Sequence, residues 1–193
     1  MQRIDEVYES LKERVFQAEF KPNEMITERE ICERYGVSHV TAGEALHRLC
    51  HEGHLTAYPR TGYMVTALTP ADMARLKRLR MVLETLVVRV LCQECAEEQL
   101  QGLYQLIADD PSEVERPSAA NRRFHTGLAR LTGDLYLINA VENVLGAASR
   151  VEQCVSPEKQ STWQDCHKGI VDALCARDAE LAVARLTEDL NQR

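Results

Sequence analysis

The chain has 193 residues, of which 45% are apolar, 27% are charged and 5% are aromatic, and its formal net charge is −7. This length suits one large domain or two small ones, and the sparse Gly and Pro exclude a low-complexity or disordered chain. Because phosphate contacts need cationic side chains, the negative charge by itself argues against a nucleic-acid-binding protein.

The first third of the chain predicts three helices. Apolar residues at helical spacing predict a helix near the start of the chain. Thr27 and Glu30 form a capping-box pattern, which predicts a short helix over residues 28–35 that Gly36 ends. Ser38 is expected to cap a third helix, whose apolar stripe comprises Ala42, Ala45, Leu46, Leu49 and Cys50.

A change of period follows the third helix. Residues 55–58 and 63–66 flank a Pro-Arg-Thr-Gly turn and predict a small hairpin. Three helices followed by a two-stranded wing form a winged helix-turn-helix, a DNA-reading module. We therefore predict a DNA-binding domain over residues 1–66.

The remainder of the chain predicts helices alone. Thr69 and Pro70 begin a long, apolar helix that runs to about residue 91. The polar segment 108–120 is expected to be a loop, and five or six helices are expected after residue 69. The predicted fold is mostly α, with an antiparallel all-helical domain over residues 67–193.

Cysteine usage, the lengths of the apolar runs and the charged start of the sequence predict a cytoplasmic protein. No apolar run approaches the ~18–20 residues that a membrane span needs, so no membrane partner is expected. The start, MQRIDEVYESLKER, is too charged for a signal peptide. Seven Cys, an odd number, are expected to be reduced thiols rather than a disulfide framework.

A winged helix-turn-helix places its second paired helix in the major groove of double-stranded DNA. Thr27 and Ser38 would hold phosphates at helix N-termini. Arg48 would lie nearer the DNA backbone, and Arg60 at the hairpin tip would reach the minor groove. The positions expected to face base edges are His39, Thr41, Gly43 and Glu44.

The segment EREICERYGVSHVTAGEALHRLCHEGHL, followed by RTGYMV, resembles the winged helix-turn-helix of GntR-family transcriptional regulators. The resemblance covers residues 5–66 without a gap. It implies DNA contacts at Arg29 and in the wing around Gly62. The matching positions are Gly36-Val37-Ser38, Glu44-Ala45-Leu46, Arg48-Leu49, Glu52-Gly53-His54-Leu55 and Gly62-Tyr63-Met64-Val65.

The recognition helix departs from that family pattern. Two Arg of the family are replaced by His39 and Gly43, and Gly43 offers no side chain to a base. Residues 1–66 hold eight Lys or Arg and eleven Asp or Glu, a net charge of −3. The sequence therefore predicts an unusual operator preference with weak contacts. A winged domain that binds proteins instead of DNA is the alternative.

Four His between residues 39 and 54 raise a metal hypothesis in this first domain. His47 and His51 are an i, i+4 pair, and His54 follows the helix. Helix surfaces that face phosphates also carry His, and no acidic or thiol ligand obviously completes a set. A phosphate-facing surface is the simpler interpretation.

The second domain resembles the FCD effector domain of the FadR branch of GntR regulators. The residues that carry the resemblance lie across the domain: Arg80-x-x-Leu83-Glu84, Asn121-x-x-Phe124-His125, His167 with Ile170 and Ala173, Asp178 with Ala182, and Asp189-Leu190. The resemblance implies a homodimer that binds an operator and responds to a small organic acid.

The same resemblance implies a divalent metal, either Zn, Ni or Mn, held by Asn121, His125, His167 and Asp189. Asn121 and His125 are spaced i, i+4 on one helix face. The chain departs from the family at two ligands, because Asn121 is a weak carbonyl ligand and Asp189 replaces a His. Buried polar residues without a metal are the alternative.

Three further residues are candidates for effector binding. Arg80 lies among apolar residues and could clamp a carboxylate, or it could pair with Glu84 at i, i+4. Arg150 is a second basic candidate. Trp163 could form a wall of the ligand site, and core packing is its alternative role.

No enzyme is predicted, because no nucleophile–base set or Gly-rich phosphate loop stands out. Cys92-x-x-Cys95 would suggest redox or zinc chemistry in a strand-turn context. Here it continues a helix, so packing residues are expected. A small metal-dependent enzyme using His125, His167 and Asp189 is the remaining alternative class.

Overall fold

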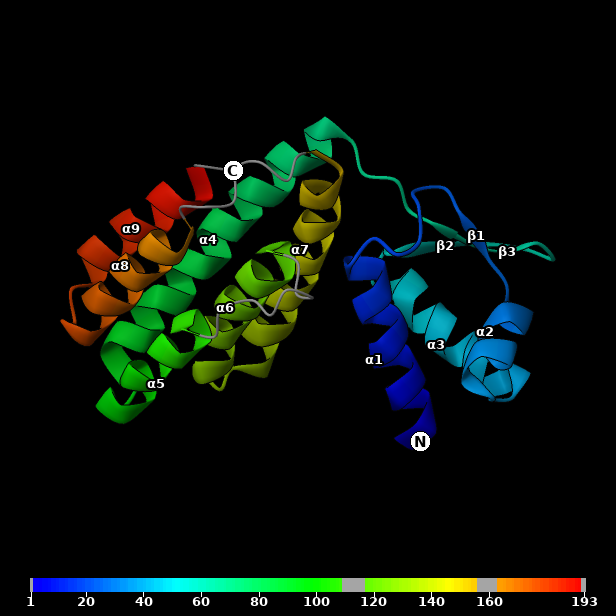
Figure 1. The fold of residues 1–193 in the computed structure, drawn as a ribbon, viewed down its shortest axis with the longest axis horizontal. Helices are drawn as coiled ribbons and strands as arrows, with labels where there is room; N and C mark the ends of the chain where they lie inside the picture. Colours follow the sequence, from blue (N-terminus) through cyan, green and yellow to red (C-terminus); the bar gives the residue numbers. More distant parts are fainter. Residues whose placement is uncertain (1, 109–116, 156–162, 192–193) are drawn as a thin grey trace. The chain divides into compact units, whose positions relative to one another are not determined.

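A computed structural model describes residues 2–108, 117–155 and 163–191, and the chain divides into two compact units, Met1–Pro70 and Ala71–Arg193 (Figure 1). Each unit has its own hydrophobic core. Across the described ranges the chain forms nine helices and three short strands, so the predicted mostly-α fold is confirmed. None of these helices is both long and apolar enough to cross a membrane.

The winged unit contains three helices and a small antiparallel sheet. Its elements are α1 (Gln2–Phe16), β1 (Met25–Ile26), α2 (Glu28–Tyr35), α3 (His39–His51), β2 (Leu55–Tyr58) and β3 (Gly62–Val65). The sheet order is β1-β3-β2. The predicted hairpin is present as β2 and β3, but the strand β1 was not predicted, because two residues are too few to reveal a strand period.

The predicted helix ends of this unit are confirmed. Thr27 Oγ1 accepts from the Glu30 amide at 3.3 Å, and Glu30 Oε2 accepts from the Thr27 amide at 2.7 Å, which completes the capping box of α2. Gly36 ends α2 with φ 61°, in the left-handed region that favours glycine. Ser38 Oγ accepts from the Thr41 amide at 3.2 Å and begins α3.

The core of the winged unit fixes α3 on its scaffold. Large side chains from α1, α2 and α3 are almost fully buried together with strand residues. Burying a Leu or Ile contributes about 1.5–3 kcal/mol, so the apolar face of α3 is firmly held and its opposite face is left exposed. The most buried members are Leu11, Val15, Ile31, Ala42, Ala45, Leu46, Leu49 and Val65.

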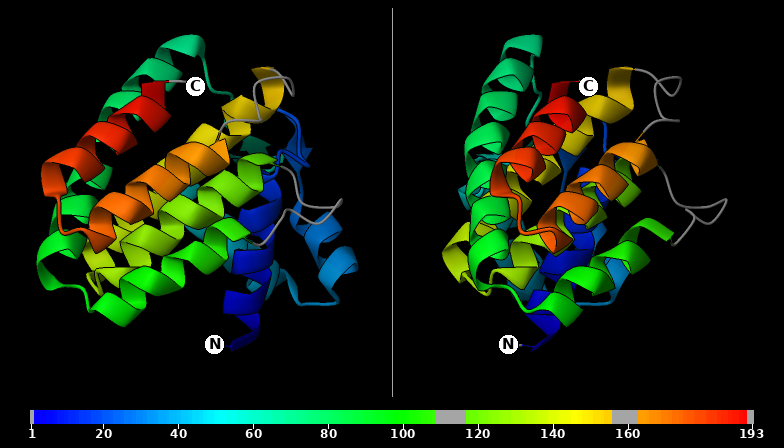
Figure 2. Two further views of the ribbon diagram at one scale, coloured as in Figure 1. Left: turned by 60° about the vertical axis from the view of Figure 1, so that its left-hand side comes forward. Right: turned by 90° about the vertical axis from the view of Figure 1, so that its left-hand side faces the viewer.

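The helical unit is an all-α assembly of six helices among its described residues. They are α4 (Pro70–Glu94), α5 (Glu97–Ala108), α6 (Pro117–Leu131), α7 (Leu135–Val155), α8 (Trp163–Cys175) and α9 (Ala179–Asn191). Consecutive helices α6 and α7, and α8 and α9, lie side by side (Figure 2). The predicted loop over residues 108–120 is too long at its end, because α6 begins at Pro117, a residue suited to the first helical turn.

The turn between α8 and α9 caps the end of α4. The Arg177 guanidinium donates to the carbonyls of Leu91, Cys92 and Cys95 at 3.1, 3.2 and 2.7 Å. The last carbonyls of a helix form the negative end of its dipole, so a cation there is stabilising. The Leu91 carbonyl also accepts from the Cys95 amide at 3.2 Å. Burial raises the pKa of the Cys92 and Cys95 thiols, which fits packing residues rather than reactive ones.

Candidate functional site

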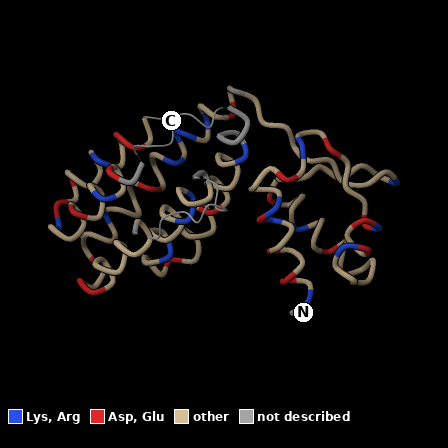
Figure 3. The backbone as a smooth tube through the Cα atoms, viewed as in Figure 1, with Lys and Arg blue, Asp and Glu red and all other residues tan. Residues whose placement is uncertain are grey.

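The exposed face of α3 carries several residues predicted to contact DNA. The side chain of His39 is 69% exposed, and that of Arg29 on α2 is 79% exposed. Thr27 and Ser38 cap the N-termini of α2 and α3, and Thr41 is half-buried. Acidic and basic residues are interleaved along this unit (Figure 3), so any phosphate-binding surface is local.

Three other predicted contact residues, Gly43, Arg48 and Gly62, have structural contacts within the winged unit. Gly43 is buried, with the Glu28 carboxylate over it, and so differs from the exposed position expected for it. Arg48 ion-pairs with Asp5 at 2.7 Å and lies 3.6 Å from Glu44. At Gly62 (φ 137°) an added Cβ would lie 2.7 Å from the Ile26 carbonyl, so this glycine is needed for the approach of β1.

The tip of the wing presents one predicted contact residue to solvent. Arg60 is exposed and adopts φ 64°, which is uncommon for a residue other than glycine. Its position between β2 and β3 suits a side chain that reaches into a groove. Its predicted role is compatible with this placement.

Two residues at or beside the N-terminal half of α3 were not predicted from the sequence. Val40, the second residue of α3, is 80% exposed. An apolar residue on the polar face of a recognition helix was the available signal, because such residues contact the thymine methyl group. Glu28 was missed because its position over α3 depends on how α2 and α3 pack together.

The cluster of His in the winged unit does not converge. His54 is buried, with its ring edge-on to Phe16 at 4.8 Å and its Nε2 3.4 Å from Glu52 Oε2. His47 lies edge-on to the Tyr63 ring at 5.5 Å. These positions favour separate structural roles over a shared metal.

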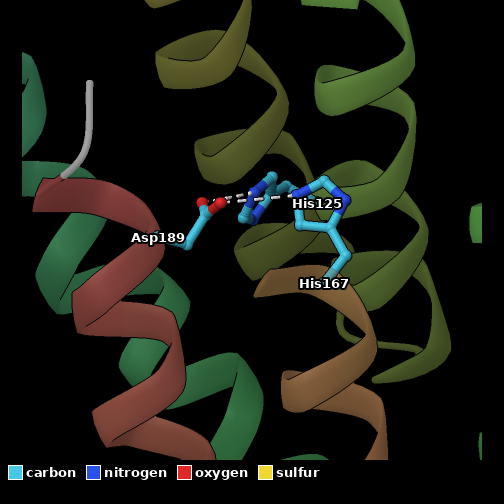
Figure 4. A group of neighbouring side chains, drawn as sticks. All are labelled: His125, His167 and Asp189. Atoms are coloured by element: carbon cyan, nitrogen blue, oxygen red, sulfur yellow. Dashed lines mark ion pairs between the residues drawn. The ribbon is translucent and has the colours of Figure 1, made fainter. Parts of the chain in front are cut away.

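The predicted metal ligands of the helical unit do converge. His125 on α6, His167 on α8 and Asp189 on α9 are all buried, and one donor atom from each lies within 4.8 Å of the others. Figure 4 shows the three side chains directed toward one another. His125 Nε2 lies 3.2 Å from Asp189 Oδ2, and His167 Nε2 lies 3.7 Å from Asp189 Oδ1.

The fourth predicted ligand lies beside this group. Asn121 is buried one turn before His125, and its Oδ1 lies 3.1 Å from His167 Nε2. Phe124 stacks on the His167 ring, with the centroids 3.9 Å apart and the planes at 14°. The stacked ring holds the plane of the His167 imidazole, whose Nε2 faces both Asn121 and Asp189.

An outer residue that the sequence reasoning did not assign to this site contacts His125. Glu84 Oε2 on α4 lies 2.5 Å from His125 Nδ1, and Arg80 Nε donates to Glu84 Oε1 at 2.7 Å. Of the two roles considered for Arg80, the i, i+4 pair with Glu84 is thus present. The signal was the local Arg-x-x-x-Glu spacing, but nothing local connects Glu84 to a His 41 residues away.

The buried charges of Glu84 and His125 are stabilised by neighbouring groups of opposite charge. Burial alone would raise the pKa of Glu84, but Arg80 and His125 lower it to about 2. Burial alone would lower the pKa of His125, but Glu84 and Asp189 outweigh that effect and raise it. The imidazole therefore lies between two carboxylates that favour its protonated form when no competing cation is bound.

The donor set fits a divalent metal. Neighbouring ligands at 2.0–2.1 Å from a tetrahedral or octahedral ion lie about 2.8–3.4 Å from one another. Two of the separations here are 3.1 and 3.2 Å, and a third is 3.7 Å. A carboxylate that accepts from the second nitrogen of a ligand His is the usual outer partner at such sites, and Glu84 has that position.

The candidate effector residues are placed in separate helices. Arg80 on α4 and Arg150 on α7 are both buried, at 5% and 7% exposure. Trp163 is the first residue of α8, and its side chain lies outside the part of the chain that the structure describes.

Comparison with known proteins extends over both units. The family described as bacterial regulatory proteins, gntR family, matches residues 3–65, and the FCD domain matches residues 75–192. The solved structure of E. coli McbR/YncC has the same fold, with a TM-score of 0.83 at 19% identity over 98% of this chain and 94% of that chain.

Two relatives share more sequence. The HTH-type transcriptional regulator YdhC of Bacillus subtilis (strain 168) is 30% identical over 71% of this chain and 64% of that protein. The Nta operon transcriptional regulator of Aminobacter aminovorans is 30% identical over 65% of this chain and 61% of that protein. The chain thus matches less than two thirds of the length of both relatives. It belongs to the GntR family of bacterial regulatory proteins and carries an FCD domain.

Proposed function

We propose that this chain is a homodimeric transcriptional regulator whose operator binding is controlled by a small organic acid bound in the helical unit with the help of a divalent metal. The observation that carries the proposal is the convergence of His125, His167 and Asp189 inside a helical unit that follows a winged helix-turn-helix in the same chain. The winged unit would supply the operator contacts and the helical unit the response.

The metal would be Zn, Ni or Mn, held by His125, His167 and Asp189 with the Asn121 carbonyl as a weaker fourth ligand. A bound divalent ion supplies a Lewis-acidic centre whose open positions accept a carboxylate. Glu84 would accept a hydrogen bond from the Nδ1–H group of His125. This bond fixes the tautomer in which the Nε2 lone pair is available to the ion. Arg80 would hold Glu84 in that position.

The organic acid would be anchored by a buried cation. Arg80 on α4 and Arg150 on α7 are both buried, and we assign the carboxylate-binding role to these two residues. A guanidinium binds a carboxylate through two parallel hydrogen bonds, which gives both energy and orientation. The role of Trp163 as a wall of the ligand site remains part of the proposal.

The homodimer is proposed because a pseudo-palindromic operator has two half-sites and needs two readers. Leu79, Val82 and Leu86 follow one another at i, i+3 and i+7 on α4 and are 46%, 67% and 50% exposed. Such a stripe is costly to leave in water. We assign this stripe to contact with the same face of a second copy.

The metal content of the purified protein tests the proposal. We expect about one Zn, Ni or Mn per chain by elemental analysis after dialysis, and loss of most of it in His125→Ala and His167→Ala. His51→Ala is the matched control, because His51 is an exposed His in the winged unit. Equal metal content in all four proteins would contradict the metal site and leave the operator-binding part of the proposal standing.

A further inference from the structure

The first residue of α2 lies over the recognition helix. The Glu28 side chain is 40% exposed, and Tyr63 Oη from β3 donates to its Oε1 at 3.1 Å. Its Oε2 lies 3.6 Å from His39 Nδ1 at the start of α3. The carboxylate is therefore positioned by contacts to two other elements of the winged unit.

Gly43 makes room for this carboxylate. A Cβ added at Gly43 would lie 3.1 Å from Glu28 Oε1, closer than most Cβ contacts. A glycine inside a helix is less stable than alanine by about 0.5–1 kcal/mol, so its presence in α3 needs a reason. The available reason is space, because a Cβ at position 43 would make a tight contact with the Glu28 oxygen and displace it by a few tenths of an ångström.

Gly43 stands where GntR-family regulators carry an Arg, and this difference changes the chemistry of the surface that faces base edges. Residues in the N-terminal half of a recognition helix approach the bases in the major groove. An Arg at position 43 would offer donors, which select the O6 and N7 acceptors of guanine. Glu28 offers only acceptors there, which repel guanine and accept from the N4 amino group of cytosine.

The carboxylate retains capacity for such a contact. Tyr63 donates to one oxygen, whereas an ionised carboxylate has about four lone-pair sites. His39 lies beyond hydrogen-bond distance of Oε2. The Glu28 side chain is partly exposed, so an acceptor on its carboxylate is open to solvent, where a base would approach.

We propose that Glu28, whose partly exposed carboxylate lies beside Gly43, is a specificity-determining residue that selects cytosine at one position of each operator half-site. This inference rests on the proposed function, in that the winged unit reads an operator. It assigns base recognition to α2 at a position that α3 leaves open.

Selection from random-sequence duplex DNA by the full chain tests the inference. The wild type is expected to enrich a motif with cytosine at one position of each half-site. In Glu28→Gln, the preference for cytosine over guanine there falls about 5- to 100-fold, and the preferred base moves toward adenine, because an amide pairs with adenine N6 and N7. In Gly43→Arg the preference moves toward guanine.

Glu9→Gln is the matched control, since Glu9 is an exposed carboxylate on α1, and it is expected to select the wild-type motif. Gln can still accept from Tyr63, and thermal unfolding verifies that each variant folds. An unchanged motif in Glu28→Gln overturns the inference alone. An equal loss of affinity for every sequence also overturns it, because that result indicates a structural role. If the folded wild type enriches no motif, both the operator-binding proposal and this inference fail.

Discussion

At the residue scale, Arg29 and Arg48 differ in how free their guanidinium groups are. Arg29 is 79% exposed, and the carboxylate of Glu33 lies 3.8 Å away. Arg48 is 37% exposed and forms a 2.7 Å ion pair with Asp5. Exposed pairs contribute little, so Arg29 can exchange Glu33 for DNA with small loss. Arg48 must give up a shorter and better aligned contact.

Arg29→Ala is therefore expected to weaken binding to the selected operator about 5- to 100-fold, the effect of losing one strong contact to a base edge or phosphate. Titration by fluorescence anisotropy over a salt series measures both the affinity and the number of ionic contacts. Arg185→Ala, which removes an exposed Arg of the helical unit, is the control. Equal affinities for Arg29→Ala and this control would exclude Arg29 from the interface.

Glu52 couples the stability of the winged unit to pH. Burial alone would raise the pKa of Glu52, but contacts from His54, Tyr8 and Lys12 lower it to about 2. The Tyr8 hydroxyl donates to Oε1, and Lys12 Nζ lies 3.0 Å from Oε2. A carboxyl with a lowered pKa binds a proton more readily when unfolded, so its stabilising effect is lost as the pH falls.

We expect the free energy of unfolding of the winged unit to fall between about pH 4.5 and pH 2, and Glu52→Gln to flatten that dependence. Urea unfolding followed by circular dichroism measures it, while fluorescence of the single Trp, in the helical unit, reports that unit separately. Glu9→Gln serves as control. A Glu52→Gln protein with the same slope as the wild type between those pH values would disprove the coupling.

At the scale of elements, the wing depends on a close approach between two strands. Met25 and Ile26 in β1 pair with Met64 and Tyr63 in β3, which places β1 against the second strand of the hairpin. Gly62 has no Cβ and a φ of 137°, so both the contact and the backbone conformation require glycine there. Gly53 also has a positive φ, 78°, but an added Cβ there would meet open space.

Gly62→Ala is expected to destabilise the winged unit by about 1–3 kcal/mol, because it combines a clash with backbone strain. Gly53→Ala adds strain alone and should destabilise by about 1 kcal/mol. Urea unfolding of both variants compares them directly. If the two substitutions destabilise equally, the approach of Ile26 to Gly62 makes no difference and the close contact has no energetic role.

The predicted elements with local signals agree with the structure. The capping box at Thr27, the left-handed Gly36 and the cap at Ser38 each depend on residues within three or four positions of one another. The strand β1 has no such signal, because its pairing partner lies about 40 residues away in β3. Local chemistry thus predicts where helices begin and end, whereas the third strand depends on tertiary pairing.

At the scale of the whole molecule, each unit buries its own core, and the apolar stripe of α4 remains exposed in a single copy. If two copies meet through this stripe, a charge at its centre must be desolvated in the dimer, which is costly. The same charge on a lone copy stays in water and costs little. Val82, 67% exposed, lies between Leu79 and Leu86 and is the position to change.

Val82→Glu is expected to convert dimers to monomers by light scattering and to lower operator affinity at least tenfold, because each monomer contacts one half-site. Gln93→Glu introduces the same charge at an exposed position near the end of α4 and is expected to remain dimeric. A dimeric Val82→Glu protein with normal operator binding would place the dimer interface elsewhere.

The sequence by itself determined the helices and their ends, the winged order of elements and the mostly helical fold, because these follow from residue period and from caps that act over a few positions. It also named candidate ligands, of which Asn121 and His125 share one helix face. Only the tertiary structure decided which side chains meet. Glu84 contacts His125, Asp5 pairs with Arg48, and Glu28 fills the space at Gly43.

These contacts join residues 15 to 43 positions apart along the chain, and they arise when apolar faces pack and bring polar groups on neighbouring elements together. No periodicity or spacing encodes them. The negative charge is the clearest example, since the net charge of −7 says little about DNA binding. What matters is which carboxylates hold basic side chains and which, like Glu28, remain on the surface, because electrostatic energy depends on distances in space.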